Sequence, residues 1–245
     1  MKKLVLVYIL STVLAFCKDY ENGLKAYEKG DYKSAVISFQ KACDKGNMNS
    51  CYTLGNLYVL NQGVKQDYKK AVKLFQKACD GGEAKACGYL GVMYENGNAV
   101  EQNRQIAAKL YEKACEMGHY ISCSELGIMY ANGNFISKDY YKAMELFKKA
   151  CEMGHYISCS ELGIMYANGN FISKDYYKAM ELFKKACEMG EANGCNYLAL
   201  MYFIYSEKSG IEQDAIKAKD YFCHACEMGF EDACESCNML SQKQD

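Results

Sequence analysis

Two consecutive stretches of this chain are identical. Residues 115–150 read CEMGHYISCSELGIMYANGNFISKDYYKAMELFKKA, and the same letters recur at residues 151–186. A unit that is followed by its own copy must present one face that fits the opposite face of the next unit. The duplication therefore predicts a stack of repeats rather than a closed globule.

Each unit contains two segments with helical periodicity. In the first segment a leucine and a tyrosine lie four residues apart, as at Leu90 and Tyr94, and so share one helix face. Gly91 lies between them, and because glycine costs about 1 kcal/mol relative to alanine inside a helix, we expect a partner helix to approach closely there. The second segment, residues 104–115, is again periodic. We predict an all-α solenoid of about six helix pairs.

The two ends of the chain differ from the repeats. Lys2 and Lys3 precede an apolar run, residues 4–17, that is too short to cross a bilayer and is typical of a signal peptide. The alternative, a first buried helix, is disfavoured because the run has no amphipathic period. A lipoprotein anchored through Cys17 fits less well than simple secretion, because Phe16 precedes the cysteine. We assign residues 1–17 to a signal peptide and 18–245 to one solenoid domain, with a capping helix at about 230–240.

Fifteen cysteines are a large excess for 245 residues. Twelve of them form six pairs whose members lie eight residues apart, and would face each other across an antiparallel helical hairpin. Such regular pairing indicates a disulfide framework and an oxidising compartment. The expected pairs are Cys43–Cys51, Cys79–Cys87, Cys115–Cys123, Cys151–Cys159, Cys187–Cys195 and Cys226–Cys234.

The C-terminal cysteines allow more than one interpretation. Cys223, Cys226, Cys234 and Cys237 have the spacing C-x2-C-x7-C-x2-C, which resembles a four-cysteine zinc site. The central gap is shorter than usual for zinc, and Cys226 and Cys234 already occupy the bridging positions of the repeat. We favour a second bridge, Cys223–Cys237, and keep zinc and a redox-active Cys223/Cys226 pair as alternatives.

Charge and histidine content exclude several functions. The net charge is −1 and the pI about 6.3, so the chain has no basic footprint for nucleic acid or an anionic membrane. His119 and His155 lie a full repeat apart and His224 is alone, so we interpret them as surface residues and predict no metal and no cofactor. We also expect no transmembrane segment in the mature chain.

Two motifs carry a family resemblance. Residues 126–133, LGIMYANG, and residues 142–151, KAMELFKKAC, resemble the Sel1-like repeat, a relative of the tetratricopeptide repeat. With paired cysteines behind a signal peptide, the chain resembles the secreted bacterial cysteine-rich proteins of the Hcp type. The resemblance implies a right-handed α/α superhelix. It departs in the loop, where a second family glycine is present as Gly63 but is replaced by Ala99, Phe135 and Phe171, which leaves the loop conformation open.

The resemblance implies a ligand groove. First helices of tetratricopeptide solenoids line a concave surface, which places the lining at the residue after the helix glycine and at the end of that helix. Asparagines there would hydrogen-bond an extended peptide, or would only cap helix ends. The candidate ligand-binding residues are Tyr52, Asn56, Val92, Asn96, Asn132, Asn168 and Asn196, with Val59 and Leu60 beside them and Tyr89, Tyr120 and Tyr197 as exposed contacts.

Hcp-type proteins are also commonly assigned penicillin binding or β-lactamase activity. Strings of the serine β-lactamase type occur at residues 38–41 (SFQK), 94–96 (YEN) and 208–210 (KSG). Ser38 aligns with leucines of the second helices, and the lactamase KSG motif belongs on a strand, so we identify no catalytic residue. We predict a secreted or periplasmic scaffold that binds a protein or peptide of the cell envelope or a host. The alternative is a penicillin-binding protein with weak β-lactamase activity, whose ligand would be a β-lactam or a peptidoglycan fragment.

Overall fold

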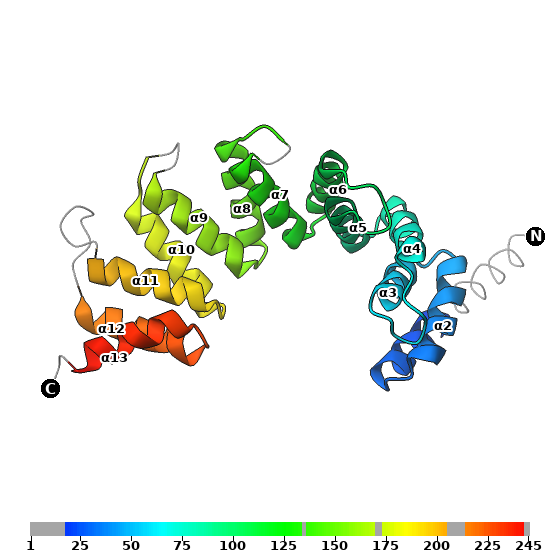
Figure 1. Cartoon of the computed structure of the whole chain (residues 1–245), viewed down its shortest axis with the longest axis horizontal. Coiled ribbons are helices and arrows are strands. Elements are labelled where there is room, and N and C mark those ends of the chain that lie inside the picture. Colours follow the sequence, from blue (N-terminus) through cyan, green and yellow to red (C-terminus); the bar gives the residue numbers. More distant parts are fainter. Residues whose placement is uncertain (1–17, 134–135, 170–172, 205–213, 243–245) are drawn as a thin grey trace, which may run out of the picture. The chain divides into compact units, whose positions relative to one another are not determined.

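The fold is all-α, as the sequence predicts. A computed structural model describes residues 18–133, 136–169, 173–204 and 214–242, and every regular element in these ranges is a helix (Figure 1). Residues 18–28 are helical. The proposed signal peptide, with Cys17, lies outside the described residues. The helices that follow are α2 (Tyr32–Asp44), α3 (Met48–Val59), α4 (Tyr68–Asp80), α5 (Ala84–Asn96), α6 (Arg104–Glu116), α7 (Tyr120–Asn132), α8 (Tyr140–Glu152), α9 (Tyr156–Asn168), α10 (Tyr176–Glu188), α11 (Ala192–Ile204), α12 (Ala215–Glu227) and α13 (Glu231–Gln242).

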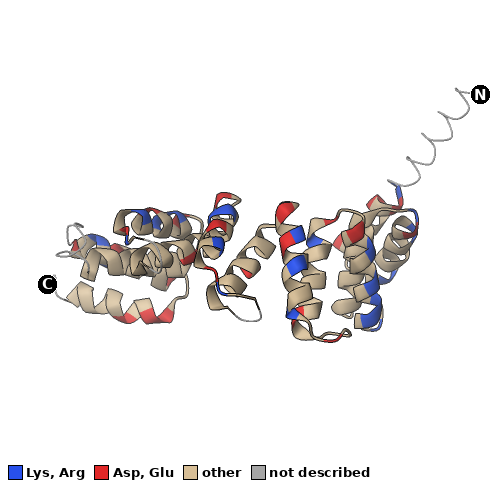
Figure 2. Cartoon of the chain, turned by 90° about the horizontal axis from the view of Figure 1, so that it is seen from above, with Lys and Arg blue, Asp and Glu red and all other residues tan. Residues whose placement is uncertain are grey.

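The chain divides into two compact units, Met1–Ser122 (unit 1) and Cys123–Asp245 (unit 2). Within unit 1 each helix from α2 to α6 packs against the next one in sequence, and within unit 2 the same holds from α8 to α13. The odd-numbered helices are the first helices of the repeats, and the even-numbered ones are the second helices. Both signs of charge are distributed over each unit (Figure 2).

Each second helix begins with the same capping bond. Asp67 precedes α4, and its carboxylate accepts a hydrogen bond from the backbone N–H of Lys70 at 2.9 Å. The first N–H groups of a helix have no partner within it, so such a cap stabilises by about 1 kcal/mol. These caps fix where the second helices start. The same bond is made by Asp31, Asn103, Asp139, Asp175 and Asp214.

A glycine in five of the first helices (residues 18–28, α3, α5, α7 and α9) lies beneath an aromatic ring of the second helix that follows, whereas α11 carries Ala199 at this position. A Cβ built on Gly55 would lie 2.6 Å from Cε1 of Phe75, a distance that leaves no room for a side chain. The two helices therefore approach until the ring covers the backbone, which is the packing reason expected from the sequence. The same contact joins Gly23 to Phe39, Gly91 to Tyr111, Gly127 to Phe147 and Gly163 to Phe183.

The loop after the first helix keeps its conformation where the family glycine is absent. The backbone φ is 71° at Gly63 and 60° at Ala99, so both residues are left-handed. A side chain is disfavoured there by about 1–2 kcal/mol, so the loop holds Ala99 against its own preference. Phe135 and Phe171 lie outside the described residues.

Within each unit, disulfides join second helices to the first helices that follow them. Cys43 near the end of α2 is bonded to Cys51 near the start of α3, with their Cα atoms 4.7 Å apart. Every cysteine in the described ranges is disulfide-bonded, Cys115 and Cys123 included. The other bonded pairs are Cys79–Cys87, Cys151–Cys159, Cys187–Cys195, Cys226–Cys234 and Cys223–Cys237.

Candidate functional site

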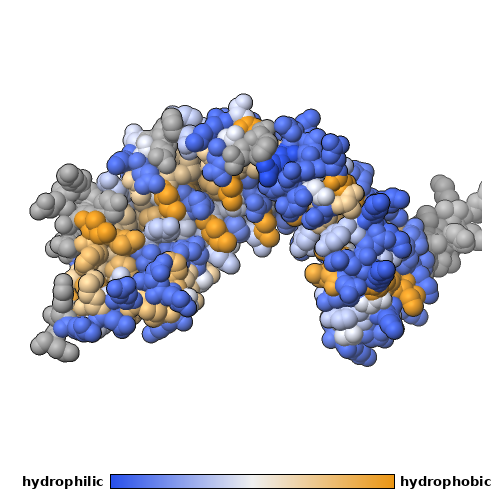
Figure 3. Space-filling view, viewed as in Figure 1, coloured by the Kyte–Doolittle hydropathy of each residue, from blue (hydrophilic) through white to orange (hydrophobic). Residues whose placement is uncertain are grey.

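A hollow of about 340 Å³ lies between α9, α10 and α11 of unit 2. We call it the unit 2 pocket. Apolar residues come to the surface over this part of the unit (Figure 3). The residues that line the pocket are Ile164, Ala167, Asn168, Phe183, Tyr197, Leu200 and Met201.

The repeat itself builds this pocket. Ile164, Ala167 and Asn168 are spaced by three and four residues on one face of α9, and Tyr197, Leu200 and Met201 are spaced in the same way on α11. Between them lies the ring of Phe183, whose centroid is 5.1 Å from that of Tyr197. The ring that covers Gly163 therefore also forms part of the pocket wall.

Asn168, a candidate ligand-binding residue, lines the pocket from the end of α9. It is exposed, and the left-handed residue that ends the helix is Gly169, with φ 68°. Asn96 has the same relation to Gly97, whose φ is 74°. Because a glycine provides the left-handed cap after both asparagines, their exposed side chains are not needed to end the helix. Ligand binding by these asparagines stays a prediction.

Unit 1 carries the same positions three repeat lengths earlier in the sequence. The ring centroid of Tyr89 lies 5.7 Å from that of Phe75, and Tyr52 adds a third ring 5.5 Å from Tyr89. Burial raises the pKa of Tyr52 to about 12, although a hydrogen bond with the side chain of Asn56 acts in the opposite direction. Tyr52 thus stays a neutral phenol. The positions equivalent to the pocket lining are Asn56, Val59, Leu60, Phe75, Tyr89, Val92 and Met93.

The other candidate ligand-binding residues lie on α5, α7 and α11. Val92 and Asn96 are one turn apart on α5, the first half-buried and the second exposed, and Asn132 is exposed at the end of α7. Asn196 is half-buried on α11 and is not among the residues that line the unit 2 pocket. The structure therefore groups Tyr52 with Asn56 in unit 1, and Asn168 with Tyr197 in unit 2.

The sequence analysis missed two carboxylates of unit 2 that do not line the pocket themselves but act electrostatically on Tyr197, which does. Glu161 is one turn before Ile164 on α9, and Glu191, which is 8% exposed, directly precedes α11. The hydroxyl of Ser160 donates to the Glu191 carboxylate. Burial raises the pKa of both carboxyl groups, and for Glu191 the charge of Glu161 adds to this while hydrogen bonds from Ser160 and from the backbone N–H of Gly194 oppose it. Burial raises the pKa of Tyr197, and the negative charges of Glu161 and Glu191 raise it further. The two carboxylates therefore influence a residue of the pocket lining.

A larger hollow, about 410 Å³, lies between the second helices α8 and α10. The ammonium group of Lys185 donates there to the backbone carbonyl of Cys151 at 3.1 Å, and Lys178 lies over the ring of Tyr166 at 5.2 Å. Lys77 makes the equivalent bond to the carbonyl of Cys43 at 2.8 Å. These lysines hold successive second helices together, so we assign this hollow to repeat stacking.

The interpretation of His119 as a surface residue was wrong. It is 9% exposed, and its Nδ1 lies 2.8 Å from Oγ of Ser122. A Cβ on Gly88 would lie 2.7 Å from the same Nδ1, so the imidazole fills the space that this glycine leaves. Its duplicate His155 is half-buried and pairs with Ser158 at 2.8 Å. Burial lowers the pKa of both histidines, which keeps them neutral at pH 7.

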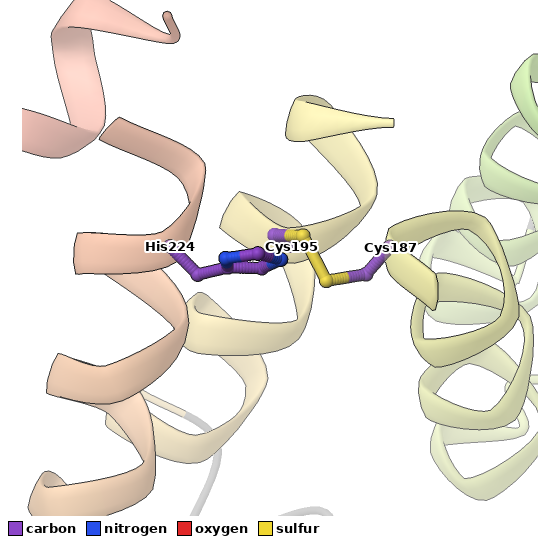
Figure 4. Close-up of side chains that lie close together, drawn as sticks. All are labelled: Cys187, Cys195 and His224. Carbon is purple, nitrogen blue, oxygen red and sulfur yellow. A yellow bond between two sulfur atoms is a disulfide. The ribbon is translucent and has the colours of Figure 1, made fainter. Parts of the chain in front are cut away.

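Within the described ranges, Cys187, Cys195 and His224 place three metal-binding side chains together, with their ligand atoms within 4.8 Å of one another (Figure 4). The two sulfur atoms are bonded to each other, which leaves no thiolate for a metal. His224 occupies the repeat position of Lys77 and Lys185. The C-terminal cysteines are likewise bonded in pairs, so we assign no metal centre to this part of the chain.

The β-lactamase strings are not assembled in the part of the chain that the structure describes. Ser38 is half-buried on α2, whereas Tyr94 lies on α5. Residues 208–210 lie outside the described ranges.

Helix pairs stapled by disulfides, with a hollow between successive first helices, define an all-α repeat scaffold. The family model for the Sel1 repeat matches residues 14–47, 49–83, 84–119, 121–155, 157–191 and 192–230. This chain belongs to the Sel1 repeat family, whose members mediate protein–protein interactions. None of the described helices combines the length and the apolar content needed to cross a bilayer.

Solved structures include similar Sel1 repeat proteins. A Sel1 repeat protein from Oxalobacter formigenes is 29% identical, with 87% of this chain and 86% of that chain covered and a TM-score of 0.79. The protective antigen c5321 of uropathogenic Escherichia coli is 26% identical, with 93% and 57% covered and a TM-score of 0.51. Helicobacter pylori cysteine rich protein B is 32% identical, with 54% and 95% covered and a TM-score of 0.45. No curated protein matches the chain.

Proposed function

We propose that this protein is an extracytoplasmic scaffold that binds a protein or peptide partner along its first helices. The observation that carries the proposal is the unit 2 pocket, whose lining falls at the positions that the family resemblance assigns to a ligand groove. Unit 1 has aromatic and polar residues at the equivalent positions, so the surface is a repeated feature of the chain.

The pocket chemistry suits a peptide. Phe183, Leu200 and Met201 offer an apolar surface for one side chain, and aromatic residues such as Tyr197 are common anchors at interfaces. The amide of Asn168 offers both a donor and an acceptor at the rim, which matches the needs of an extended backbone.

The disulfides support an oxidising location. Cysteines in reducing compartments stay mostly as thiols, whereas every described cysteine here is bonded. With residues 1–17 as a signal peptide, the mature protein would be secreted or periplasmic. Sequencing the N-terminus of protein recovered from periplasm and medium tests this, and a mature chain that retains residues 1–17 in the cytoplasm would contradict it.

Site-specific photo-crosslinking tests the binding function. A photoreactive phenylalanine at Tyr197 should capture one defined partner in the producing cells or on a host cell, and Leu200→Asp should abolish that product. Ile216→Asp is the matched control, because Ile216 is 64% exposed on α12 and does not line the pocket. Equal crosslinking in both variants, or none from Tyr197, would count against the proposal.

The enzymatic alternative has its own test. The oxidised protein, purified twice, would have to hydrolyse a chromogenic cephalosporin with turnover for β-lactamase activity to be credited. Loss of that activity in Ser38→Ala would then identify the nucleophile, whereas no turnover leaves the scaffold as the supported function.

A further inference from the structure

We propose that the unit 2 pocket and the adjacent carboxylates Glu161 and Glu191 bind a peptide that places a lysine or arginine next to an apolar side chain. The apolar side chain enters the pocket, and the cationic group lies against the two carboxylates. This inference rests on the proposed function and names the chemistry of the partner.

The order of residues on α9 matches a ligand with a cationic group beside an apolar side chain. Glu161, Ile164 and Asn168 share one helix face and offer in turn a negative charge, an apolar contact and an amide. Glu191 adds a second carboxylate from the residue before α11. Tyr197 connects the apolar pocket with the carboxylates, because it lines the pocket and the charges of Glu161 and Glu191 raise the pKa of its phenol.

The two carboxylates lack a cation of their own. Burial acts against the charge of each, and no lysine, arginine or histidine among the described residues contributes to either pKa. Acidic residues elsewhere in the unit are arranged differently, as where Asp175 caps α10 and pairs with Lys178 at 3.6 Å. Hydrogen bonds from Ser160 and Gly194 offset part of the cost of burying the Glu191 charge, but neither carboxylate has a cationic partner, which a bound lysine or arginine would supply.

The duplication provides a control within the same chain. Helices α7 and α9 have the same sequence, YISCSELGIMYAN, so Glu125 and Glu161 occupy the same repeat position. The repeat after α7 begins with His155 where the repeat after α9 begins with Glu191. A pair of carboxylates at these positions therefore occurs beside α9 and not beside α7, and Glu125→Gln is the matched control for Glu161→Gln.

The probe is a displayed library of random twelve-residue peptides selected on the oxidised full-length protein. We expect the selected sequences to pair Lys or Arg with Leu, Ile, Phe or Met. One such peptide is then synthesised with its Lys or Arg and with Gln at that position. The cation should improve Kd by roughly ten-fold for the wild type, as expected for a charge pair that becomes desolvated.

Variants distinguish this inference from the function on which it rests. In Glu161→Gln and in Glu191→Gln the two peptides should bind alike, whereas Glu125→Gln should preserve the ten-fold difference. If the selected peptides lack a cation, or if the difference survives both Gln variants, the inference is wrong; the groove itself still stands if Leu200→Asp abolishes binding. If no peptide is selected, both fail. Glutamine keeps an acceptor for the Ser160 hydroxyl, so the Glu191 variant should fold.

Discussion

The ring of Phe183 lies on the backbone of Gly163, so close that a Cβ there would be 2.7 Å from Cε1 of the ring. Alanine usually stabilises a helix by about 1 kcal/mol relative to glycine, but here its Cβ would collide with the ring of Phe183, which is only 2% exposed. We therefore expect Gly163→Ala to destabilise the protein by roughly 1–3 kcal/mol, measured by chemical denaturation.

A second substitution checks the cause. Phe183→Leu makes space at the same contact, so the double variant should lose less stability than the sum of the two single variants. Additive losses would show that the ring is not what excludes the side chain.

At Ala99, in contrast, we expect substitution by glycine to stabilise the protein. Its φ of 60° is left-handed, and glycine adopts that conformation freely. Ala99→Gly should raise the free energy of unfolding by roughly 0.5 kcal/mol or more, after the greater flexibility of the unfolded chain is counted, and so raise the denaturation midpoint. Ala131→Gly, inside α7, is the control and should lower the midpoint. Equal losses in both variants would argue against a left-handed Ala99.

The disulfides predict the thiol content of the protein. The denatured, unreduced protein should show no free thiol from residues 18–245, because every described cysteine is bonded. Four free thiols from the C-terminal cluster would instead support the zinc alternative. Replacing Cys79 and Cys87 together by alanine should cost about 2.5 kcal/mol on the loop-entropy model.

His224 predicts a stabilising substitution. At the same repeat position, the ammonium of Lys185 donates to the last turn of the preceding second helix, through the carbonyl of Cys151. His224→Lys should restore such a bond to the carbonyl of Cys187 and add roughly 0.3–1 kcal/mol, the usual gain for a cation at a helix C-terminus. Lys185→His should lose a similar amount, and a gain in that variant would contradict the assignment.

Glu191 predicts an unusual pH dependence. Burial raises its pKa in the folded protein, so its favourable contribution is present below the unfolded pKa and is lost as the pH rises through the folded value. Glu191→Gln should therefore be more stable than the wild type at pH 7, and should lose that advantage near pH 4. Melting curves at the two pH values decide it, and a variant that is equally weak at both would contradict the charge argument.

Features that recur with the repeat could be predicted from the sequence, because the same residue type appears at the same position in successive copies. The glycine at positions such as Gly91 recurred at a fixed interval, and the structure shows the helix contact that explains it. The capping residue at positions such as Asp67 recurred as well, although the sequence analysis did not use it. The pocket positions came from the family resemblance, since periodicity marks a helix face without saying which face stays open.

Features that occur once were not predictable. Glu161 and Glu191 lie 30 residues apart, and a histidine replaces Glu191 in the copy before it, so no repeated pattern connects them. His119 was assigned to the surface because an isolated histidine carries no burial signal, whereas the space above Gly88 that holds it depends on two helices.

The eight-residue spacing of the disulfides also governs how the chain can oxidise. A loop of this size closes in well under a microsecond, so each cysteine meets its proper partner before any distant one. A chain that enters an oxidising compartment from its N-terminus can therefore complete its bridges one hairpin at a time. The nested pair Cys223–Cys237 around Cys226–Cys234 is different, because its four cysteines arrive together and allow three pairings. Mispairing, and any need for a disulfide isomerase, should concentrate in this last hairpin.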